Sequence, residues 1–597
     1  MQNHRSEHAL ARAVLTSSYH WRSALKLVRA LVGLIAFFPI ATLGDPLPPP
    51  VSRSYATALP ILAKHGMVVT QQAEASRIGL DVLRFGGNAV DAAVAVAVTL
   101  PAAGNLGGGG FMLIHRAEFN NTTAIDYRET APAAARKDDF LDAKGEADPS
   151  KSRFSGLAIG VPGTVAGLEL AWRKYGSGKF SFAELVAPAI ALARKGLTVD
   201  AGLADSLPFA QPMLARSPAS ARIYLRSDGG LPQLGDHIAL DDLADTLETI
   251  AREGATGFYT GPVARKIVDA VQAAGGRMTE ADLSNYRAAE REPVVGTYRG
   301  HAVVSMPPPS SGGAHLIEIL NILEGFPIRE WGLNSAASIH AMAEAEKLAY
   351  ADRAEWLGDP DFVKVPLKGL VSKPYADSLR ALIAQDKARP ASEIRPGDPM
   401  RYESDQTTHF SIVDKDGNAV SNTYTLNFPY GSGLVAEGTG VLLNNELDDF
   451  AAKPGAPNAY RLLGGEANEP GPAKRPLSSM SPTLVLDKDG HVELVTGSPG
   501  GSTIITTVAQ ILVNVIDHGL NAAEAENAPR VHDQLWPDEL RVERGVSPDT
   551  IRLLEAMGHR VVVRAAIGSA NTIARASDGT LTGASDLRQR GTLAVGY

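Results

Sequence analysis

The chain has 597 residues, a formal net charge of −9, 21% charged residues and 44% hydrophobic residues. This composition is typical of a soluble globular protein with a large core, and the acidic balance argues against nucleic acid as a partner. Cysteine is absent, which excludes disulfides, thiolate metal sites and a cysteine nucleophile, and the 14 histidines show no metal-ligand spacing. We therefore expect no metal and no cofactor, and any covalent chemistry must use serine or threonine.

The first 44 residues predict a targeting segment. Basic residues precede an apolar run, ALVGLIAFFPIATL, at 30–43, and Gly44 follows the run. A membrane span needs about 20 apolar residues, so this shorter run is typical of a secretory signal. We expect a periplasmic or secreted protein in which residues 1–44 are either a cleaved signal peptide or an uncleaved membrane anchor.

Helices and strands are predicted directly after the targeting segment. Residues 71–83 have the period of an amphipathic helix, and residues 91–100, DAAVAVAVTL, predict a buried helix because they are apolar on nearly every side. Two strands are expected at 111–115 and 123–127. The glycine run NLGGGG at 105–110 lacks the lysine of a phosphate-binding loop, so it favours a tight turn against packed backbone.

The middle of the chain is predicted to be mostly helical, with clear periods at 182–194 and 239–252. Further helices are expected at 314–323 and 336–354. The helix at 336–354 carries five charged residues, which are Glu344, Glu346, Lys347, Asp352 and Arg353. Charges on one helix most often form a solvated, ion-paired face, and we expect that here.

Residues 387–406, KARPASEIRPGDPMRYESDQ, are polar, rich in proline and charge, and without helix or strand period. Such a segment is typical of an exposed, mobile connector that is easily cut. A cut between Gln406 and Thr407 would give Thr407 a free α-amine, with a pKa of about 7.7 to 8.0, beside its own hydroxyl. The amine could then take the proton from the hydroxyl nucleophile.

A β-hairpin is predicted at 405–427, because alternating apolar and polar runs flank a loop of Lys415, Asp416 and Gly417. With a three-residue loop, positions equally far from Asp416 face each other, which sets Thr407 opposite Thr425. Directly opposed residues have Cβ atoms about 4.5 to 5.5 Å apart, so the two hydroxyls would be in contact. From these residues alone, a surface hairpin with threonines chosen for β-propensity stays an alternative to a catalytic pair.

The C-terminal part of the chain predicts strands at 440–444, 483–486 and 491–495. An irregular loop at 453–473 has the length of a lid, and a helix is expected at 502–518. Gly500 and Gly501 come just before that helix, where free backbone N–H groups suit an oxyanion. A simple tight turn fits the two glycines equally well.

Seven motifs in fixed order resemble the γ-glutamyltranspeptidases, a family of the N-terminal nucleophile hydrolase superfamily. The motifs are AIDYRETAPA, MPPPSSGG, AEAEKLAYADR, TTHFSIVDKDGNAVSNTYTLN, NNELDDF, KRPLSSMSPT and TGSPGGS. The similarity runs from about residue 66 to residue 597, which is essentially the whole chain after the targeting segment.

The resemblance implies an α+β fold, a four-layer αββα sandwich that two subunits of one precursor build jointly. The precursor would cut itself before Thr407, so that residues 45–406 form the large subunit and residues 407–597 the small, catalytic subunit of a heterodimer. The implied activity is hydrolysis of γ-glutamyl compounds such as glutathione. The γ-glutamyl group would pass through a threonine ester to water, an amino acid or a dipeptide.

The resemblance also assigns the catalytic residues. Thr407 would be the nucleophile, and Thr425 would hydrogen-bond it, which agrees with the pairing expected from the loop length. The backbone N–H groups of Gly500 and Gly501 would form the oxyanion hole. Tyr460, in the long loop, would be the lid residue of the bacterial type.

A γ-glutamyl group carries an α-carboxylate and an α-ammonium, so its site needs a cation and hydroxyls at one end and carboxylates at the other. The resemblance assigns the α-carboxylate to Arg128, Ser478 and Ser479. It assigns the α-amine to Asn427, Glu446 and Asp449. One departure from the family pattern is Leu587, where relatives usually carry proline, and we expect no catalytic cost from it.

Two other functions remain as alternatives. A glutaryl or cephalosporin acylase could use the same scaffold, although such relatives tend to replace the acid at Asp449, which this chain keeps. A secreted binding protein that has the fold but is never processed is the alternative from a different class. A serine hydrolase of the α/β type is disfavoured because no G-x-S-x-G motif occurs.

Overall fold

The computed structural model describes residues 58–99, 104–401 and 411–597, which all belong to one unit of the chain, Pro49–Tyr597. The targeting segment lies outside the described residues, and so does the stretch 402–410 with Thr407 and the expected cut. The subunit boundaries therefore stay predictions. Within the described part of the chain, no helix is both long enough and apolar enough to cross a membrane.

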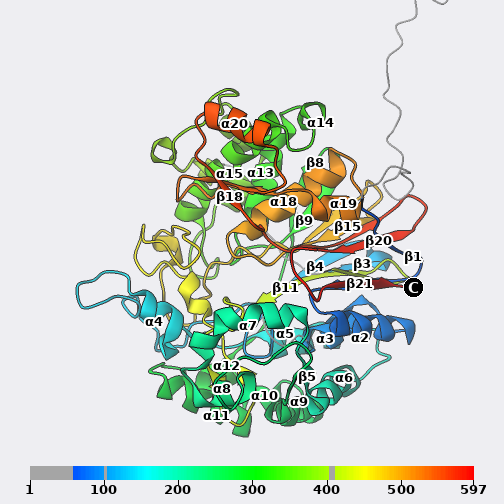
Figure 1. The fold of residues 1–597 in the computed structure, drawn as a ribbon, viewed down its shortest axis with the longest axis vertical. Helices are drawn as coiled ribbons and strands as arrows, with labels where there is room; N and C mark the ends of the chain where they lie inside the picture. The colour runs from blue at the N-terminus through cyan, green and yellow to red at the C-terminus, as the bar shows by residue number, and fades with distance from the viewer. Residues whose placement is uncertain (1–57, 100–103, 402–410) are drawn as a thin grey trace, which may run out of the picture. The chain divides into compact units, whose positions relative to one another are not determined.

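Two seven-stranded antiparallel sheets form the centre of this unit (Figure 1). In order across the first sheet, the strands are β1 (Ile61–Ala63), β20 (Leu581–Ser585), β19 (Asn571–Arg575), β15 (Val492–Thr496), β14 (Thr483–Leu486), β9 (His301–Ser305) and β8 (Val294–Tyr298). Across the second sheet they are β21 (Leu593–Gly596), β2 (Met67–Thr70), β10 (Ser411–Val413), β11 (Ala419–Thr425), β3 (Gly109–Arg116), β4 (Asn121–Tyr127) and β7 (Ala289–Arg291). Buried apolar side chains from both sheets, such as Phe111 and Val495, pack in one cluster between them.

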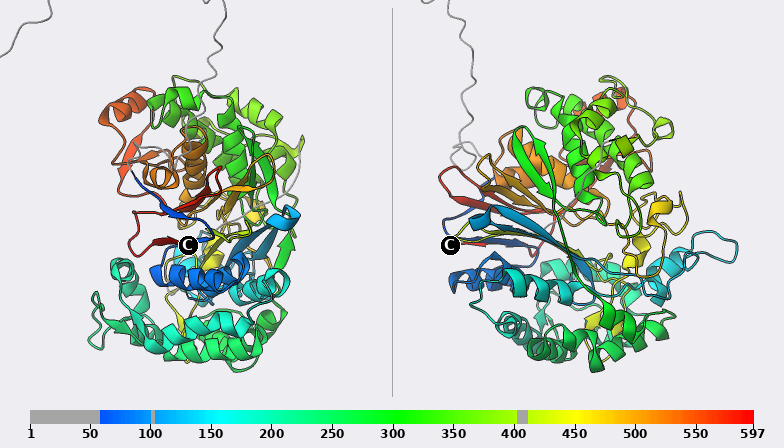
Figure 2. Two further views of the ribbon diagram at one scale, coloured as in Figure 1. Left: turned by 90° about the vertical axis from the view of Figure 1, so that its right-hand side faces the viewer. Right: turned by 180° about the vertical axis from the view of Figure 1, so that it is seen from behind.

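Helices cover the outer face of each sheet, which makes four layers (Figures 1 and 2). On the second sheet lie α2 (Ala73–Arg84), α3 (Ala89–Ala97), α5 (Thr164–Tyr175), α6 (Phe182–Lys195), α7 (Ala201–Leu214), α8 (Pro218–Tyr224), α9 (Asp241–Glu253), α10 (Thr256–Tyr259), α11 (Gly261–Ala273) and α12 (Glu280–Asn285). On the first sheet lie α13 (Gly312–Glu324), α14 (Ile328–Trp331), α15 (Ala336–Trp356), α16 (Leu367–Leu370), α17 (Lys373–Arg380), α18 (Thr503–Ile516), α19 (Ala522–Asn527) and α20 (Pro548–Ala556). The predicted αββα sandwich of α+β class is confirmed.

Shorter elements complete the described chain. They are α4 (Pro149–Phe154), the strand pair β5 (Leu197–Thr198) and β6 (His237–Ile238), the pair β12 (Val435–Ala436) and β13 (Val441–Leu442), and a three-stranded sheet of β16 (Val531–His532), β17 (Leu540–Glu543) and β18 (Val561–Arg564).

The hairpin of β10 and β11 has the predicted register. Ile412 pairs with Val420 and Val413 with Ala419, so positions equally far from Asp416 face each other. Gly417 has a φ of +85°, the left-handed conformation that the tight loop requires. The expected pairing of Thr407 with Thr425 continues this register but involves a residue outside the described part.

The glycine run before β3 is a turn against packed backbone, as predicted. A Cβ added at Gly107 would overlap the carbonyl oxygen of Leu442, and one at Gly108 would overlap that of Thr425. Only glycine allows the chain to pass this close to the end of β11.

Helices expected from periodicity are confirmed with small shifts at their ends, as for 71–83, which is α2, and 502–518, which is α18. The strand expected at 440–444 shrinks to β13, because it pairs only with the two-residue β12. In the connector, residues 387–401 contain two 3-10 turns and no helix or strand. This part is mostly exposed, yet Gly397 N–H donates to Asp352 at 2.6 Å and so anchors it.

The expected solvated face of α15 is wrong. Glu344, Glu346, Lys347, Asp352 and Arg353 are all at most 5% exposed. The helix packs against α13, α17, α20 and β16, so that no side of this part faces water. These buried groups bind other protein groups in place of water. Lys347 pairs with Glu344, and Glu346 accepts from Asp533 N–H at 2.7 Å. Asp352 accepts from Tyr375 O–H at 2.5 Å.

Candidate active site

A cavity of about 370 Å³, the central cavity, collects every predicted site residue that the structure describes. Its lining includes Arg128, Thr425, Asn427, Glu446, Asp449, Tyr460, Ser478, Ser479, Gly500 and Gly501. They come from the ends of β4 and β11, from the 3-10 turn η6 (Glu446–Asp449) and from three loops. Thr407, the expected nucleophile, lies outside the described residues.

Arg128 lies at the centre of a buried charge cluster. Its side chain directly follows β4 and is 0% exposed. The Nη2 atom lies 2.7 Å from Asp449 Oδ2, Nη1 donates to Glu446 Oε1, and Nε donates to the carbonyl of Pro476 at 3.2 Å. One guanidinium is thus shared between the two acids that were expected to bind an amine.

Burial changes the protonation of this cluster. Loss of water raises the pKa of Glu446 to about 8, although Arg128 acts in the opposite direction. Burial also raises the pKa of Asp449. For Arg128, burial alone would lower the pKa, but Glu446, Asp449 and Glu129 outweigh it and raise the pKa. Once Glu446 ionises, Glu446 and Asp449 together carry more charge than Arg128 balances, so the cluster can then hold a second cation, which a ligand ammonium can supply.

Glu129 is a buried acid that the sequence analysis did not single out, although it stands in the AIDYRETAPA motif. Its carboxyl is 0% exposed, and neither oxygen has a hydrogen-bond partner among the described residues. Burial and the charge of Glu446 raise its pKa well above the usual range. A neutral Glu129 keeps the net charge of the cluster from becoming more negative.

The Ser478–Ser479 pair presents its hydroxyls through contacts with Arg353. Arg353 Nη2 donates to Ser479 Oγ at 3.1 Å, and its Nε donates to Ser311 Oγ at 2.9 Å. Ser311 O–H in turn donates to the carbonyl of Ser478 at 2.6 Å. Because a guanidinium can only donate, Ser479 Oγ must accept, and its own proton is left for a ligand in the cavity. Met480 N–H binds Ser478 Oγ in the same way, at 3.1 Å.

Gly500 and Gly501 bring backbone N–H groups to the cavity just before α18. Their φ values are +139° and +57°, which glycine adopts without strain. A Cβ at Gly501 would overlap the ring of Tyr460. Neither N–H has an acceptor among the described residues, so both are available to an anion at a helix N-terminus.

Tyr460 closes one side of the cavity. Its O–H donates to the carbonyl of Asn427 at 2.8 Å, which links the long loop to the end of β11. Asn427 N–H donates to Thr425 Oγ1 at 2.8 Å, so this oxygen accepts and the hydroxyl proton of Thr425 remains to be donated. Tyr460 therefore lines the cavity from the long loop, and its role as a lid stays a prediction.

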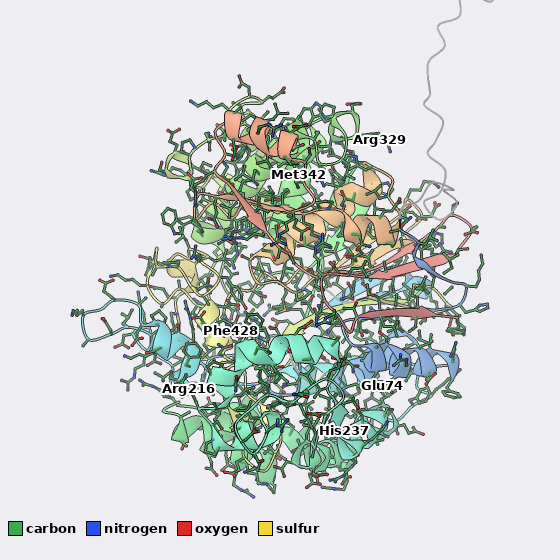
Figure 3. All side chains as sticks on the ribbon, viewed as in Figure 1. Glu74, Arg216, His237, Arg329, Met342 and Phe428 are labelled. Carbon is green, nitrogen blue, oxygen red and sulfur yellow. The ribbon has the colours of Figure 1, made fainter. Side chains whose placement is uncertain are left out.

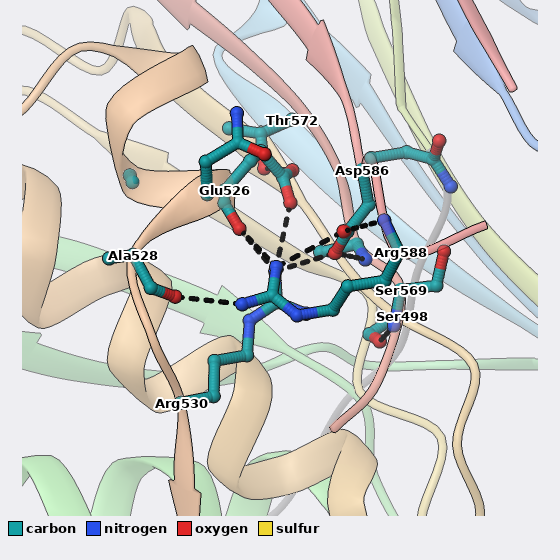
Figure 4. A network of polar contacts seen from close by, with 12 residues as sticks. Ser498, Glu526, Ala528, Arg530, Ser569, Thr572, Asp586 and Arg588 are labelled. Atoms are coloured by element: carbon teal, nitrogen blue, oxygen red, sulfur yellow. Dashed lines mark hydrogen bonds and ion pairs between the residues drawn. The ribbon is translucent and has the colours of Figure 1, made fainter. Parts of the chain in front are cut away.

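A buried network supports the loop that carries the two glycines (Figure 4). Ser569 N–H donates to Ser498 Oγ at 2.9 Å, and Ala570 N–H donates to Asp586 at 2.9 Å. Asp586 also pairs with Arg530 at 2.7 Å. The contacts of Ser569 and Ala570 thus link the C-terminal stretch to the glycine loop. Leu587, the departure from the family pattern, is 78% exposed beside the network.

Two groups of possible metal ligands occur among the described residues, and neither lines the central cavity. In the buried group, His340 and His559 hydrogen-bond each other at 2.8 Å, and Glu344 pairs with Lys347. Since each side chain already has a protein partner, the geometry is that of a structural contact. The second group, at Asp487, Asp489 and His491, lies on an exposed turn.

Comparisons with known proteins agree with the fold and the cavity. The four-layer sandwich places the chain in the fold class of the N-terminal nucleophile hydrolases. Residues 75–596 match the Gamma-glutamyltranspeptidase family model, and the chain belongs to the γ-glutamyltranspeptidase family.

Similar proteins carry two kinds of name. The chain is 54% identical to the "Glutathione hydrolase proenzyme" of Escherichia coli (strain K12), over 95% of this chain and 98% of that protein. It is 47% identical to the protein of the same name from Pseudomonas sp. (strain A14), over 91% and 96%. The crystal structure of cephalosporin acylase from Bacillus halodurans has a TM-score of 0.80 and 27% identity, over 93% of this chain and 99% of that chain.

The raised pKa of Glu446 predicts how the cavity discriminates ligands. L-glutamate and glutarate differ only in the α-amine, so their affinity ratio reports the amine contact. Below pH 8 Glu446 is mostly neutral and cannot pair with an ammonium, so the preference for L-glutamate should rise as pH increases from 6.5 to 8.5, by up to about tenfold per unit. Glu446→Gln should remove most of this rise, whereas the exposed control Glu437→Gln should keep the wild-type rise. Competition assays measure both affinities, and a flat wild-type ratio would contradict the assignment.

The contacts of Arg353 predict a second selectivity. Replacing Arg353 by Gln removes the donors that turn the serine hydroxyls toward the cavity, so the preference for L-glutamate over its α-amide should fall about tenfold. Arg353→Lys should keep part of the preference for L-glutamate, because lysine can still donate hydrogen bonds. The matched control is Arg299→Gln, which removes another part-buried arginine, paired with Asp517 outside the cavity. Equal losses for both ligands would mean that Arg353 only stabilises the fold.

Proposed function

We propose that this chain is a proenzyme that cuts itself before Thr407 and then hydrolyses γ-glutamyl compounds such as glutathione, or transfers the γ-glutamyl group to amino acids or peptides. The observation that carries this proposal is the content of the central cavity, where one guanidinium, two acids, two serine hydroxyls and two free backbone N–H groups lie together. The family membership and the names of the relatives support the same activity.

The cut needs only residues of this chain. The Oγ of Thr407 attacks the carbonyl carbon of Gln406, the C–N bond breaks, and the acyl group moves from nitrogen to oxygen. Water then hydrolyses the resulting ester, which leaves a carboxylate on Gln406 and a free α-amine on Thr407. That amine, with a pKa of about 7.7 to 8.0, becomes the general base of the mature enzyme. The two products would be a large subunit ending at residue 406 and a small subunit of residues 407–597, which remain associated.

In turnover, the two ends of the substrate head group find opposite partners. The α-carboxylate would bind Arg128 and the hydroxyls of Ser478 and Ser479, while the α-ammonium would bind Glu446 and Asp449, with Asn427 beside them. Two charged ends held at once fix the position of the γ-carbonyl, which reduces the entropy cost of the reaction.

The chemical steps follow from the free N-terminus. Thr407 Oγ attacks the γ-carbonyl carbon, and its proton passes to its own α-amine. The backbone N–H groups of Gly500 and Gly501 stabilise the negatively charged oxygen of the tetrahedral intermediate. The hydroxyl of Thr425 donates a hydrogen bond to Thr407 Oγ. The protonated α-amine of Thr407 gives its proton to the amide nitrogen of the leaving group, and the C–N bond breaks. The γ-glutamyl group is then bound to Thr407 as an ester. Water or an acceptor amine then attacks the ester by the same route in reverse.

A glutaryl or cephalosporin acylase on the same scaffold is the alternative enzyme, and the similar fold of the Bacillus halodurans acylase gives it support. The acids at Glu446 and Asp449 favour the γ-glutamyl substrate, because a glutaryl group has no amine to pair with them. Side-by-side assays of γ-glutamyl and glutaryl p-nitroanilides separate the two enzymes.

For localisation, we propose that the protein acts in the periplasm or outside the cell. The proposal rests on the basic and apolar pattern of residues 1–44, with an uncleaved anchor as the alternative. Mass spectrometry of the N-terminus of the purified large subunit distinguishes a start near residue 45 from an intact leader.

The variant Thr407→Ala tests the proposed function. It should yield one uncut chain without γ-glutamyl hydrolase activity, because the only attacking hydroxyl is lost. The neighbouring Thr408→Ala is the matched control and should still be cut before Thr407. Gel electrophoresis and mass spectrometry report the cut. A single uncut band in the wild type would favour a binding protein, and a processed, active Thr407→Ala would refute the proposed nucleophile.

A further inference from the structure

A second cavity beside the central one has an aromatic lining. It has a volume of about 470 Å³, and we name it the aromatic groove. One wall is α7 with Phe209, and the other is the segment Phe428–Tyr430 after β11. Phe154, at the end of α4, and Arg216, just after α7, complete the rim. Figure 3 labels Arg216 and Phe428, which lie close together on this side of the molecule.

The groove and the central cavity share a wall. Phe428 and Pro429 line both of them. The ring of Phe428 lies edge-on to Tyr460 at 6.2 Å between ring centroids and to Phe154 at 6.4 Å. The two cavities therefore adjoin at Phe428 and Pro429, next to Tyr460.

Arg216 offers an uncompensated positive charge at the rim. Its guanidinium carbon lies 5.4 Å from the centroid of the Phe154 ring, and no carboxylate among the described residues forms an ion pair with it. Nearby arginines differ in this respect, since Arg222 pairs with Glu437 at 3.1 Å and Arg590 pairs with Asp205. The groove thus combines apolar surface with a free cation, which suits an aromatic or apolar group next to a carboxylate.

A third cavity, of about 440 Å³, also adjoins the central one through Gln71, Gly104, Pro429 and Pro499. Its charged groups are already engaged. Arg588 lies 2.5 Å from Glu543, and Asp200 accepts from Leu203 N–H at 2.8 Å at the start of α7. A ligand there would have to displace these partners, so the aromatic groove is the better candidate.

We propose that the aromatic groove is the subsite for the acceptor of γ-glutamyl transfer, and that it selects peptides with an aromatic residue and a free C-terminal carboxylate. The acceptor amine enters the central cavity to attack the ester, the aromatic side chain packs between Phe209 and Phe428, and the carboxylate pairs with Arg216. This inference rests on the proposed function and adds the class of acceptor to it.

The length of the acceptor follows from the separation of the two ends. Arg216 does not line the central cavity, whereas the attacking amine must lie in it. In a single amino acid the amine and carboxylate are within about one residue length, roughly 3.5 Å, and each further residue adds about as much. We therefore expect a dipeptide or longer peptide, rather than a single amino acid, to contact Arg216 while its amine lies in the central cavity.

The test uses glutathione as donor and three acceptors: glycyl-L-phenylalanine, its C-terminal amide, and glycylglycine. For the wild type, KM should be about tenfold lower for glycyl-L-phenylalanine than for the other two, because each lacks one of the expected contacts. Arg216→Gln should remove the advantage over the amide, and Phe209→Ala the advantage over glycylglycine. Chromatography of the γ-glutamyl peptide measures transfer, and release of glutamate measures hydrolysis.

Each variant has a matched control. For Phe209, which is 89% exposed, the control is Phe85→Ala, because Phe85 is 78% exposed and does not line the groove. Arg265→Gln removes an exposed arginine outside all three cavities. Both controls should keep the wild-type preferences. If glutathione is hydrolysed but the three acceptors have equal KM, or if the Arg216 and Phe209 variants keep the wild-type preferences, the groove is not the acceptor subsite. Absence of hydrolysis would instead refute the proposed function.

Discussion

The buried guanidinium of Arg128 is the interaction on which the central cavity depends. A charge without water costs several kcal/mol unless charged or polar groups surround it, so Arg128 fixes the positions of Glu446 and Asp449. These acids are 318 and 321 residues further along the chain. If the chain is cut before Thr407, Arg128 belongs to one subunit and both acids to the other. The same ion pairs would then shape the substrate site and hold the two subunits together.

Buried polar side chains of α15 also hold the residues that line the central cavity. On α15, Arg353 contacts Ser311 and Ser479, and one turn earlier Tyr350 O–H donates to the carbonyl of Ser502 beside the two glycines. A single helix therefore contacts both the serine pair and the glycine loop. Polar side chains in such a helix reduce hydrophobic burial, but they position hydroxyls and N–H groups that an apolar helix could not.

Much of the fold could be predicted from sequence, because local periodicity and loop length act over short distances. The register of β10 and β11 was predicted from the length of the three-residue loop centred on Asp416. The helices α2 and α18 were predicted from their apolar stripes. The site residues were found through motifs. Contacts between residues hundreds of positions apart, such as those of Arg128 with Glu446 and Asp449, could not be predicted from local sequence patterns.

The clearest failure concerns Arg353 and its neighbours on α15. Charged residues on a helix are usually solvated, and nothing in the sequence shows that other elements cover this helix on every side. Glu129 and the aromatic groove were missed for the same reason, since each depends on distant segments that the fold brings together. Burial of charge is thus the property that sequence patterns report least well, and here it defines the site.

The most direct measurement is a crystal structure of the processed protein with a γ-glutamyl group trapped from a slow substrate. The expected result is an ester on Oγ of Thr407, with the α-ammonium about 3 Å from Glu446 and Asp449 and the α-carboxylate on Arg128 and the two serines. An adduct on any other residue, or a head group bound away from Arg128, would contradict this assignment of the cavity.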